Sequence, residues 1–308
     1  MRTEPLQLET KDGKWWDGML FEPRGARRTA QACLVVHGAV GNYLQGFPRR
    51  LAFGLAERGH TVLSINTRMA NYGALFGGGL LHRTPADIDA AVDALRRRGY
   101  KRIILCGYSM GATMVTYYQA TVAPPEVKAL CTFAHPWSLP DSLRRRWDRF
   151  GARPSYEVVA ERVRAALGNE PEDPTNDRIM LVHRSQGPSD RPEHTELWTY
   201  STWWFSRGPE ADAACSWRWI DRVKVPVALI QAGSDPLIAD HEASRLAELA
   251  RSPGVRPVIV RQIPGANHIF DRRESEAVRA ASDYIDLLDE IQDDGKGFAL
   301  SKVSAERG

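Results

Sequence analysis

The sequence lacks the features that mark membrane-spanning, secreted and repetitive proteins. No stretch approaches the roughly 18 consecutive apolar residues of a membrane-spanning helix, so we expect no membrane partner. The first residues are polar and include no apolar signal-peptide segment, which leads us to expect a cytoplasmic protein. Neither an internal repeat nor a low-complexity segment is evident.

Cysteine is scarce, with 4 in 308 residues and no Cys-x-x-Cys pair, which excludes a disulfide framework and a zinc site of that kind. Cys33, Cys106 and Cys131 lie in apolar runs, where a thiol packs as a small hydrophobic side chain. Four further histidines show no metal-ligand spacing: His82, His135, His183 and His194. We therefore expect no metal and no cofactor.

A strong excess of either charge is also missing. Lysine and arginine number 41 against 38 acidic residues, which gives a net charge of +3. The short basic clusters at 96–98 and 144–146 are more typical of solvated helix faces than of a phosphate-binding stripe. We expect no nucleic-acid partner, but a small-molecule substrate, and either a monomer or a homodimer.

The most informative stretch that is present runs from Arg102 to Gln119. An apolar run leads into Gly107-Tyr-Ser-Met-Gly111, and a segment able to form a helix follows. A serine on a sharp strand-to-helix turn brings its neighbours' backbones together, so glycine fits on both sides of it. The turn would expose the hydroxyl of Ser109 at the N-terminus of that helix.

Apolar strands alternate with amphipathic helices along most of the chain, a pattern typical of parallel β-α units. An opening hairpin precedes them, and the helix that begins near Thr84 has a Thr-Pro-Ala-Asp87 start that is typical of an N-cap. We expect an α/β fold with a doubly wound, mostly parallel, eight-stranded sheet. The expected strands are 5–9, 15–22, 32–36, 61–65, 102–106, 127–133, 226–231 and 258–263.

The alternation stops between residues 137 and 219. This segment contains charged helical stretches near 141–150 and 155–168 and holds most of the tryptophans. We interpret it as an inserted, mainly helical cap on a core formed by 1–136 and 220–292, with a polar tail at 293–308. The cap tryptophans either form the core of this subdomain or line a substrate cavity; the candidates for the cavity are Trp137, Trp203 and Trp204.

Two further residues complete a candidate catalytic set with Ser109. A serine hydroxyl needs a base to take its proton, and the base needs a third group to hold its tautomer. Asp235 follows the strand at 226–231, and His268 follows the strand at 258–263. Because parallel strands end at the same edge of a sheet, these three side chains can meet there.

These motifs resemble those of the α/β-hydrolase superfamily, and the resemblance covers nearly the whole chain. They are the Gly107–Gly111 elbow, His37-Gly-Ala-Val-Gly41, Gly-Ser-Asp235-Pro and Gly-Ala-Asn-His268. The resemblance implies an oxyanion hole built from the backbone N–H groups of Met110 and Ala39, with Val40 as a further candidate. A serine nucleophile argues against a dehalogenase or an epoxide hydrolase.

The sequence thus predicts a serine hydrolase that cleaves a carboxylic ester through an acyl-enzyme, on a bulky apolar or aromatic substrate. The alternatives are a thioesterase, lactonase or peptidase of a biosynthetic pathway, a carbon–carbon bond hydrolase, and a ligand-binding homologue without activity.

Residues around the expected site have weaker signals. Tyr108 and Arg68 are candidate substrate contacts, although an arginine at that position more often braces loops. His37 is expected to orient the oxyanion loop. The Gly77-Gly-Gly79 run lacks the strand-to-helix context of a phosphate loop and is interpreted as a rim of the active site.

Overall fold

The computed structural model describes residues 1–23, 30–39, 41–71, 79–172, 179–185, 192–251 and 257–293. Of residues 150, 181–185, 192–197 and 291–293 it describes the backbone alone. Three of the sequence predictions therefore fall wholly or partly outside the described residues: Val40, the glycines 77 and 78, and the tail beyond residue 293.

The central sheet has eight strands in the order β1-β2-β4-β3-β5-β6-β9-β10. The first two neighbouring pairs, β1 with β2 and β2 with β4, are antiparallel, and the other pairs are parallel. This confirms the predicted fold class. The strands are β1 (Arg2–Glu9), β2 (Trp15–Glu22), β3 (Gln31–Val36), β4 (Val62–Ile65), β5 (Arg102–Tyr108), β6 (Val127–Phe133), β9 (Val227–Ala232) and β10 (Val258–Ile263).

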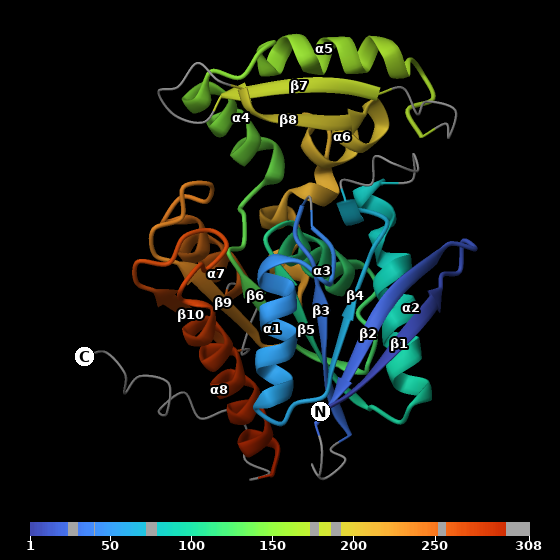
Figure 1. Ribbon diagram of the computed structural model, residues 1–308, viewed down its shortest axis with the longest axis vertical. Helices are drawn as coiled ribbons and strands as arrows, with labels where there is room; N and C mark the ends of the chain where they lie inside the picture. Colours follow the sequence, from blue (N-terminus) through green and yellow to red (C-terminus); the bar gives the residue numbers. More distant parts are fainter. Residues whose placement is uncertain are drawn as a thin grey trace.

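Helices cover both faces of the sheet, because strands such as β3 are buried along their whole length and present apolar side chains to both sides. One face packs against α1 (Gly46–Glu57) and α8 (Glu274–Asp293), which lie nearest the viewer in Figure 1. The other face packs against α2 (Thr84–Arg97), α3 (Met110–Thr121) and α7 (Glu242–Arg251). Two separate apolar cores result, one on each side.

A further layer lies above the sheet at the top of Figure 1. It contains α4 (Leu139–Phe150), α5 (Tyr156–Leu167), β7 (Ile179–Ser185), β8 (Pro192–Thr199) and α6 (Tyr200–Arg207). These elements have a third apolar core of their own, centred on Trp147, Tyr156 and Trp203. The antiparallel β7–β8 pair was not predicted from the sequence, which indicated a mainly helical segment without naming any strand in it.

The chain returns from this layer through three short 3₁₀ turns, Asp212–Ala214, Ser216–Arg218 and Ile220–Arg222. Ala213, Ala214 and Ile220 are buried in the same core as α2, α3 and α7. The return segment therefore packs with the sheet, not with the separate core above it.

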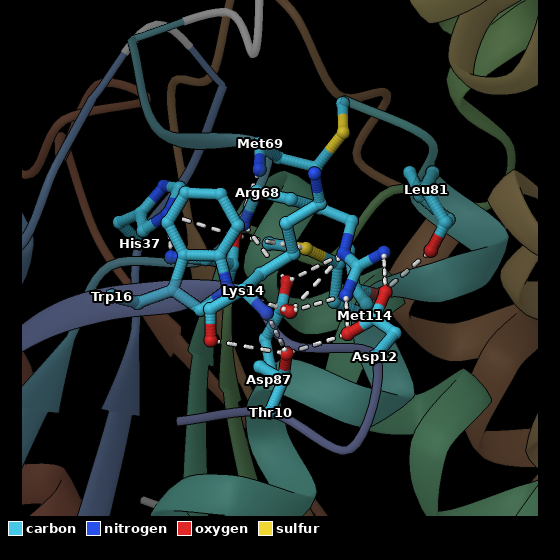
Figure 2. A network of polar contacts seen from close by, with 12 residues as sticks. Thr10, Asp12, Lys14, Trp16, His37, Arg68, Met69, Leu81, Asp87 and Met114 are labelled. Carbon is cyan, nitrogen blue, oxygen red and sulfur yellow. Dashed lines mark hydrogen bonds and ion pairs between the residues drawn. The ribbon is translucent and has the colours of Figure 1, made fainter. Parts of the chain in front are cut away.

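A buried ion pair ties the opening hairpin to the interior (Figure 2). The Asp87 carboxylate accepts hydrogen bonds from Nε and Nη2 of Arg68, from the Arg68 backbone N–H and from Trp16 Nε1. The Arg68 guanidinium also donates to Asp12 in the hairpin turn, at 2.9 Å. Thr84 was expected to be the N-cap of α2, with Asp87 in the first turn; in the structure Thr84 is the first residue of the helix, and Asp87, in its first turn, neutralises a buried cation.

We expect Asp87→Asn to lower the free energy of unfolding by about 3–5 kcal/mol, because an amide would leave the buried Arg68 charge without its main counterion. Urea unfolding measures the change. Lys11→Ala is the matched control: it removes the Lys11–Asp89 pair, in which the lysine is exposed, and should leave the midpoint unchanged. Equal shifts for the two variants would contradict this assignment.

Candidate active site

The turn between β5 and α3 holds Ser109 in a strained backbone conformation, with φ of 53° and ψ of −118°. The turn is tight enough to require glycine on both sides of it. A Cβ atom on Gly107 would lie 2.5 Å from the carbonyl oxygen of Gly111, and one on Gly111 would collide with the carbonyl oxygen of Val36. The sequence therefore folds here as its glycine spacing predicts.

The structure brings Ser109, His268 and Asp235 together in one hydrogen-bonded chain. His268 Nε2 lies 2.9 Å from Ser109 Oγ, and His268 Nδ1 lies 2.7 Å from Asp235 Oδ2. Because a carboxylate can only accept, Nδ1 carries the proton, and the Nε2 lone pair faces the serine hydroxyl. The arrangement can remove the proton from Ser109 and store positive charge on the ring beside a carboxylate.

Asp235 is itself fixed by the loop that follows β9. Its side chain is 0% exposed, and its second oxygen, Oδ1, accepts from the backbone N–H groups of Leu237 and Ile238 at 2.8 and 3.1 Å. These bonds leave Oδ2 free for His268. The carboxylate is thereby oriented before any substrate binds.

The loop after β3 passes close to Ser109: a Cβ atom added to Gly38 would lie 3.2 Å from the Cβ atom of Ser109. The backbone N–H of Thr67 donates to His37 Nε2 at 3.1 Å, so Nδ1 is the protonated nitrogen and donates to the Gly38 carbonyl at 2.8 Å. In a trans peptide the C=O and the next N–H point in opposite directions. Fixing the Gly38 oxygen against His37 therefore turns the N–H of Ala39 away from His37.

Two backbone N–H groups, those of Ala39 and Met110, have no hydrogen-bond acceptor within the part of the chain that the structure describes. Met110 is the first residue of α3, whose initial N–H groups lack partners inside the helix. The same two amides are the ones predicted from the sequence as donors of an oxyanion hole.

Two buried histidines near the site stay neutral. Burial lowers the pKa of His37 to about 4 and that of His135, which follows β6, to about 3. His135 Nδ1 lies 3.1 Å from Thr132 Oγ1, which in turn donates to a backbone carbonyl in β9. His135 is thus anchored within the sheet edge and takes no part in the Ser109–His268–Asp235 chain.

Two candidate substrate contacts have other partners. Tyr108 is only 8% exposed, and its hydroxyl donates to the backbone carbonyl of His268 at 3.2 Å. Arg68 is buried and ion-paired with Asp87 and Asp12, which corresponds to the bracing alternative. The guanidinium cannot reach a substrate carboxylate while it holds these two carboxylates.

The tryptophans differ from one another in position. Trp203 and Trp204 are buried in the separate core above the sheet, so the expectation that they line a cavity is not supported. Trp137 is half-buried, stacks on Trp217 with ring centroids 6.0 Å apart, and lies under the guanidinium of Arg245.

Glu242, at the start of α7, is a residue that the sequence analysis missed. Its side chain is nearly fully buried; it accepts from the Trp137 backbone N–H at 2.6 Å and pairs with Arg145 on α4. Ser142 on α4 also donates to the Leu237 carbonyl, in the loop that carries Asp235. The upper layer is therefore attached to the loop that carries Asp235. In sequence Glu242 looks like any polar residue of an amphipathic helix.

Among the described residues, no group of three or more histidine, cysteine or acidic side chains is arranged to hold a metal ion. Within the same residues, no helix has the length and apolar character needed to cross a membrane.

The sequence profile of the alpha/beta hydrolase family matches residues 33–297. The chain belongs to this family. A search of the curated proteins by sequence found no match. Among solved structures, this protein is similar to Est1E from Butyrivibrio proteoclasticus. The two share 17% identity and superpose with a TM-score of 0.62, over 94% of this chain and 99% of that one.

Two further solved structures are similar to this alpha/beta hydrolase. The esterase Pf2001 from Pyrococcus furiosus has 16% identity and a TM-score of 0.60, over 92% of each chain. A structure of Est1E with bound ferulic acid has 14% identity and a TM-score of 0.62, over 91% of this chain and 97% of that one. At these identities the likeness shows the shared fold.

The buried histidines predict how the stability of this hydrolase depends on pH. The unfolded chain takes up a proton on each histidine near pH 6.5, whereas folded His37 and His135 do so only near 4 and 3. The stability that these two histidines contribute by staying neutral is complete above about pH 6.5. It falls as the pH is lowered, by up to about 1.4 kcal/mol per pH unit for each histidine.

We expect His135→Gln to flatten this dependence, because it removes one of the groups that only the unfolded chain protonates. Urea unfolding of both proteins at about pH 7 and about pH 5 measures the slope, whatever the stability of the variant at neutral pH. An unchanged slope would contradict the assignment of His135 as a buried neutral group.

Proposed function

We propose that this alpha/beta hydrolase is a serine esterase that cleaves a carboxylic ester through an acyl-enzyme. The observation that carries the proposal is the continuous hydrogen-bonded chain from Ser109 through His268 to Asp235. In this proposal Ser109 is the nucleophile, His268 is the general base and Asp235 orients the base, and their geometry is the one that acyl transfer needs. Structural neighbours that are esterases, such as Pf2001 from Pyrococcus furiosus, support the same reaction class.

In the first step, Ser109 Oγ attacks the ester carbonyl carbon while His268 Nε2 takes the hydroxyl proton. The carbonyl oxygen becomes an oxyanion, which the N–H groups of Ala39 and Met110 bind. Each donor of this type contributes roughly 3–4 kcal/mol to the stability of the transition state. Asp235 stabilises the imidazolium that forms and keeps the ring in place.

The imidazolium then gives its proton to the alcohol oxygen, the C–O bond breaks, and the acyl group remains on Ser109. Water enters, His268 takes one of its protons, and the acyl-enzyme is hydrolysed through a second oxyanion. The bond between the acyl carbon and Ser109 Oγ then breaks, the imidazolium returns its proton to Oγ, and the carboxylic acid leaves. Serine and base are restored, and no cofactor takes part in this cycle.

We further propose a bulky apolar or aromatic substrate. Two apolar side chains are exposed in the loops that carry the site: Ile269, which follows His268, at 54% and Leu44, in the loop before α1, at 49%. Ferulic acid, which is bound in the Est1E structure, is a substituted aromatic acid of the kind this surface suits. The segment 137–219 is proposed as the cap over this site.

We expect the wild-type protein to hydrolyse p-nitrophenyl esters, with higher kcat/KM for longer or aromatic acyl groups. Ser109→Ala should lower kcat by at least about 10⁴-fold, because nucleophile and base act as one unit. Release of p-nitrophenolate, followed by absorbance, measures both effects.

Ser275→Ala is the matched control, since Ser275 is exposed near the start of α8, and it should retain full activity. A folded wild-type protein without turnover on the whole panel, or a Ser109→Ala variant with undiminished turnover, would overturn the proposal.

A further inference from the structure

Tyr108, the last residue of β5, contacts two groups beside Ser109: His268 and the backbone of Gly38. Its ring lies on the α1/α8 side of the sheet, against Phe47, with ring centroids 5.2 Å apart. The same ring lies 5.6 Å from that of His268. With 8% of its surface exposed, Tyr108 has little area left for a substrate.

The first contact joins Tyr108 to the general base. Its hydroxyl donates to the His268 backbone carbonyl at 3.2 Å, while Ser109 Oγ lies 2.9 Å from His268 Nε2. Two consecutive residues of the elbow therefore hold His268 at two points, one on its backbone and one on its ring. A residue held at two points cannot rotate away from the serine as a unit.

The second contact joins Tyr108 to the loop that carries the Ala39 amide. A Cβ atom added to Gly38 would lie 2.9 Å from both Cδ1 and Cε1 of the Tyr108 ring. The ring therefore packs directly on the Gly38 backbone, so glycine is required there. The carbonyl of Gly38 is held by His37, and the Gly38–Ala39 peptide is thus confined between the two side chains.

We propose that Tyr108 is a positioning residue: through its hydroxyl it fixes the general base, and through its ring it fixes the oxyanion amide, both relative to Ser109. The inference rests on the proposed esterase function and extends it. Burial raises the pKa of Tyr108, so the hydroxyl keeps its proton and remains a donor at neutral pH.

Tyr108→Phe tests the contact with His268, because it removes the hydroxyl and keeps the ring. An alkyl ester needs His268 to protonate its leaving alcohol, whereas p-nitrophenolate leaves without that help. We expect kcat to fall about five- to tenfold for an ethyl ester and at most about twofold for the p-nitrophenyl ester of the same acid, with KM unchanged. A general loss of structure would lower both rates equally.

Tyr108→Leu tests the contact with Gly38, because it removes the ring as well. A boronic acid forms a tetrahedral adduct on an active serine and so reports the oxyanion site without turnover. We expect the phenylboronic acid inhibition constant to rise about tenfold or more in Tyr108→Leu and to change at most about threefold in Tyr108→Phe.

Tyr100→Phe is the matched control: it removes a buried tyrosine hydroxyl that donates to Glu22, on the distant β2 strand, and should leave both rates unchanged. An active wild-type protein whose Tyr108→Phe variant loses nothing, or loses the same factor on both esters, overturns this inference alone. A folded wild-type protein that hydrolyses neither ester overturns the proposed function, and this inference with it.

Discussion

The close approach of backbone to backbone at Gly107 and Gly111 is the constraint on which the site depends. It allows β5 to turn into α3 within one residue and forces Ser109 into the left-handed region, with φ of 53°. The turn brings the serine hydroxyl and the first amide of α3 to the same place. The loops after β9 and β10 end at that edge because their strands are parallel to β5 and lie in one sheet, and so they supply Asp235 and His268.

The contacts that hold the candidate site extend well beyond Ser109, His268 and Asp235. Two consecutive residues of the loop after β4 bond to different parts of the protein. Thr67 donates its backbone N–H to His37, which holds the Gly38 carbonyl, and Arg68 donates its own to Asp87 on α2. The buried ion pair and the loop of Gly38 are thereby connected through the two adjacent residues Thr67 and Arg68. On the other side, Glu242 fixes the upper layer beside the loop of Asp235.

Much of this could be predicted from the sequence, because periodicity and turn chemistry are local. The strands, their parallel arrangement and the elbow follow from apolar runs and from glycine spacing. The partners of Asp87 and Tyr108 do not, because each is set by a distant segment: Asp87 lies in the first turn of α2, as the sequence predicts, but its carboxylate neutralises Arg68. The β7–β8 pair was missed for a similar reason, since its strands lie in a segment dominated by charged and aromatic residues. Trp203 is buried by its neighbours in the upper layer, which tryptophan content alone does not reveal.

The most direct test of the central claim is the intact mass of the protein after reaction with a fluorophosphonate, which labels only a serine activated by a neighbouring base. The account predicts a single phosphonyl adduct on the folded wild-type protein, on the peptide that contains Ser109, and none on Ser109→Ala. A folded wild-type protein that gains no adduct, or a Ser109→Ala variant that gains the same one, would contradict it.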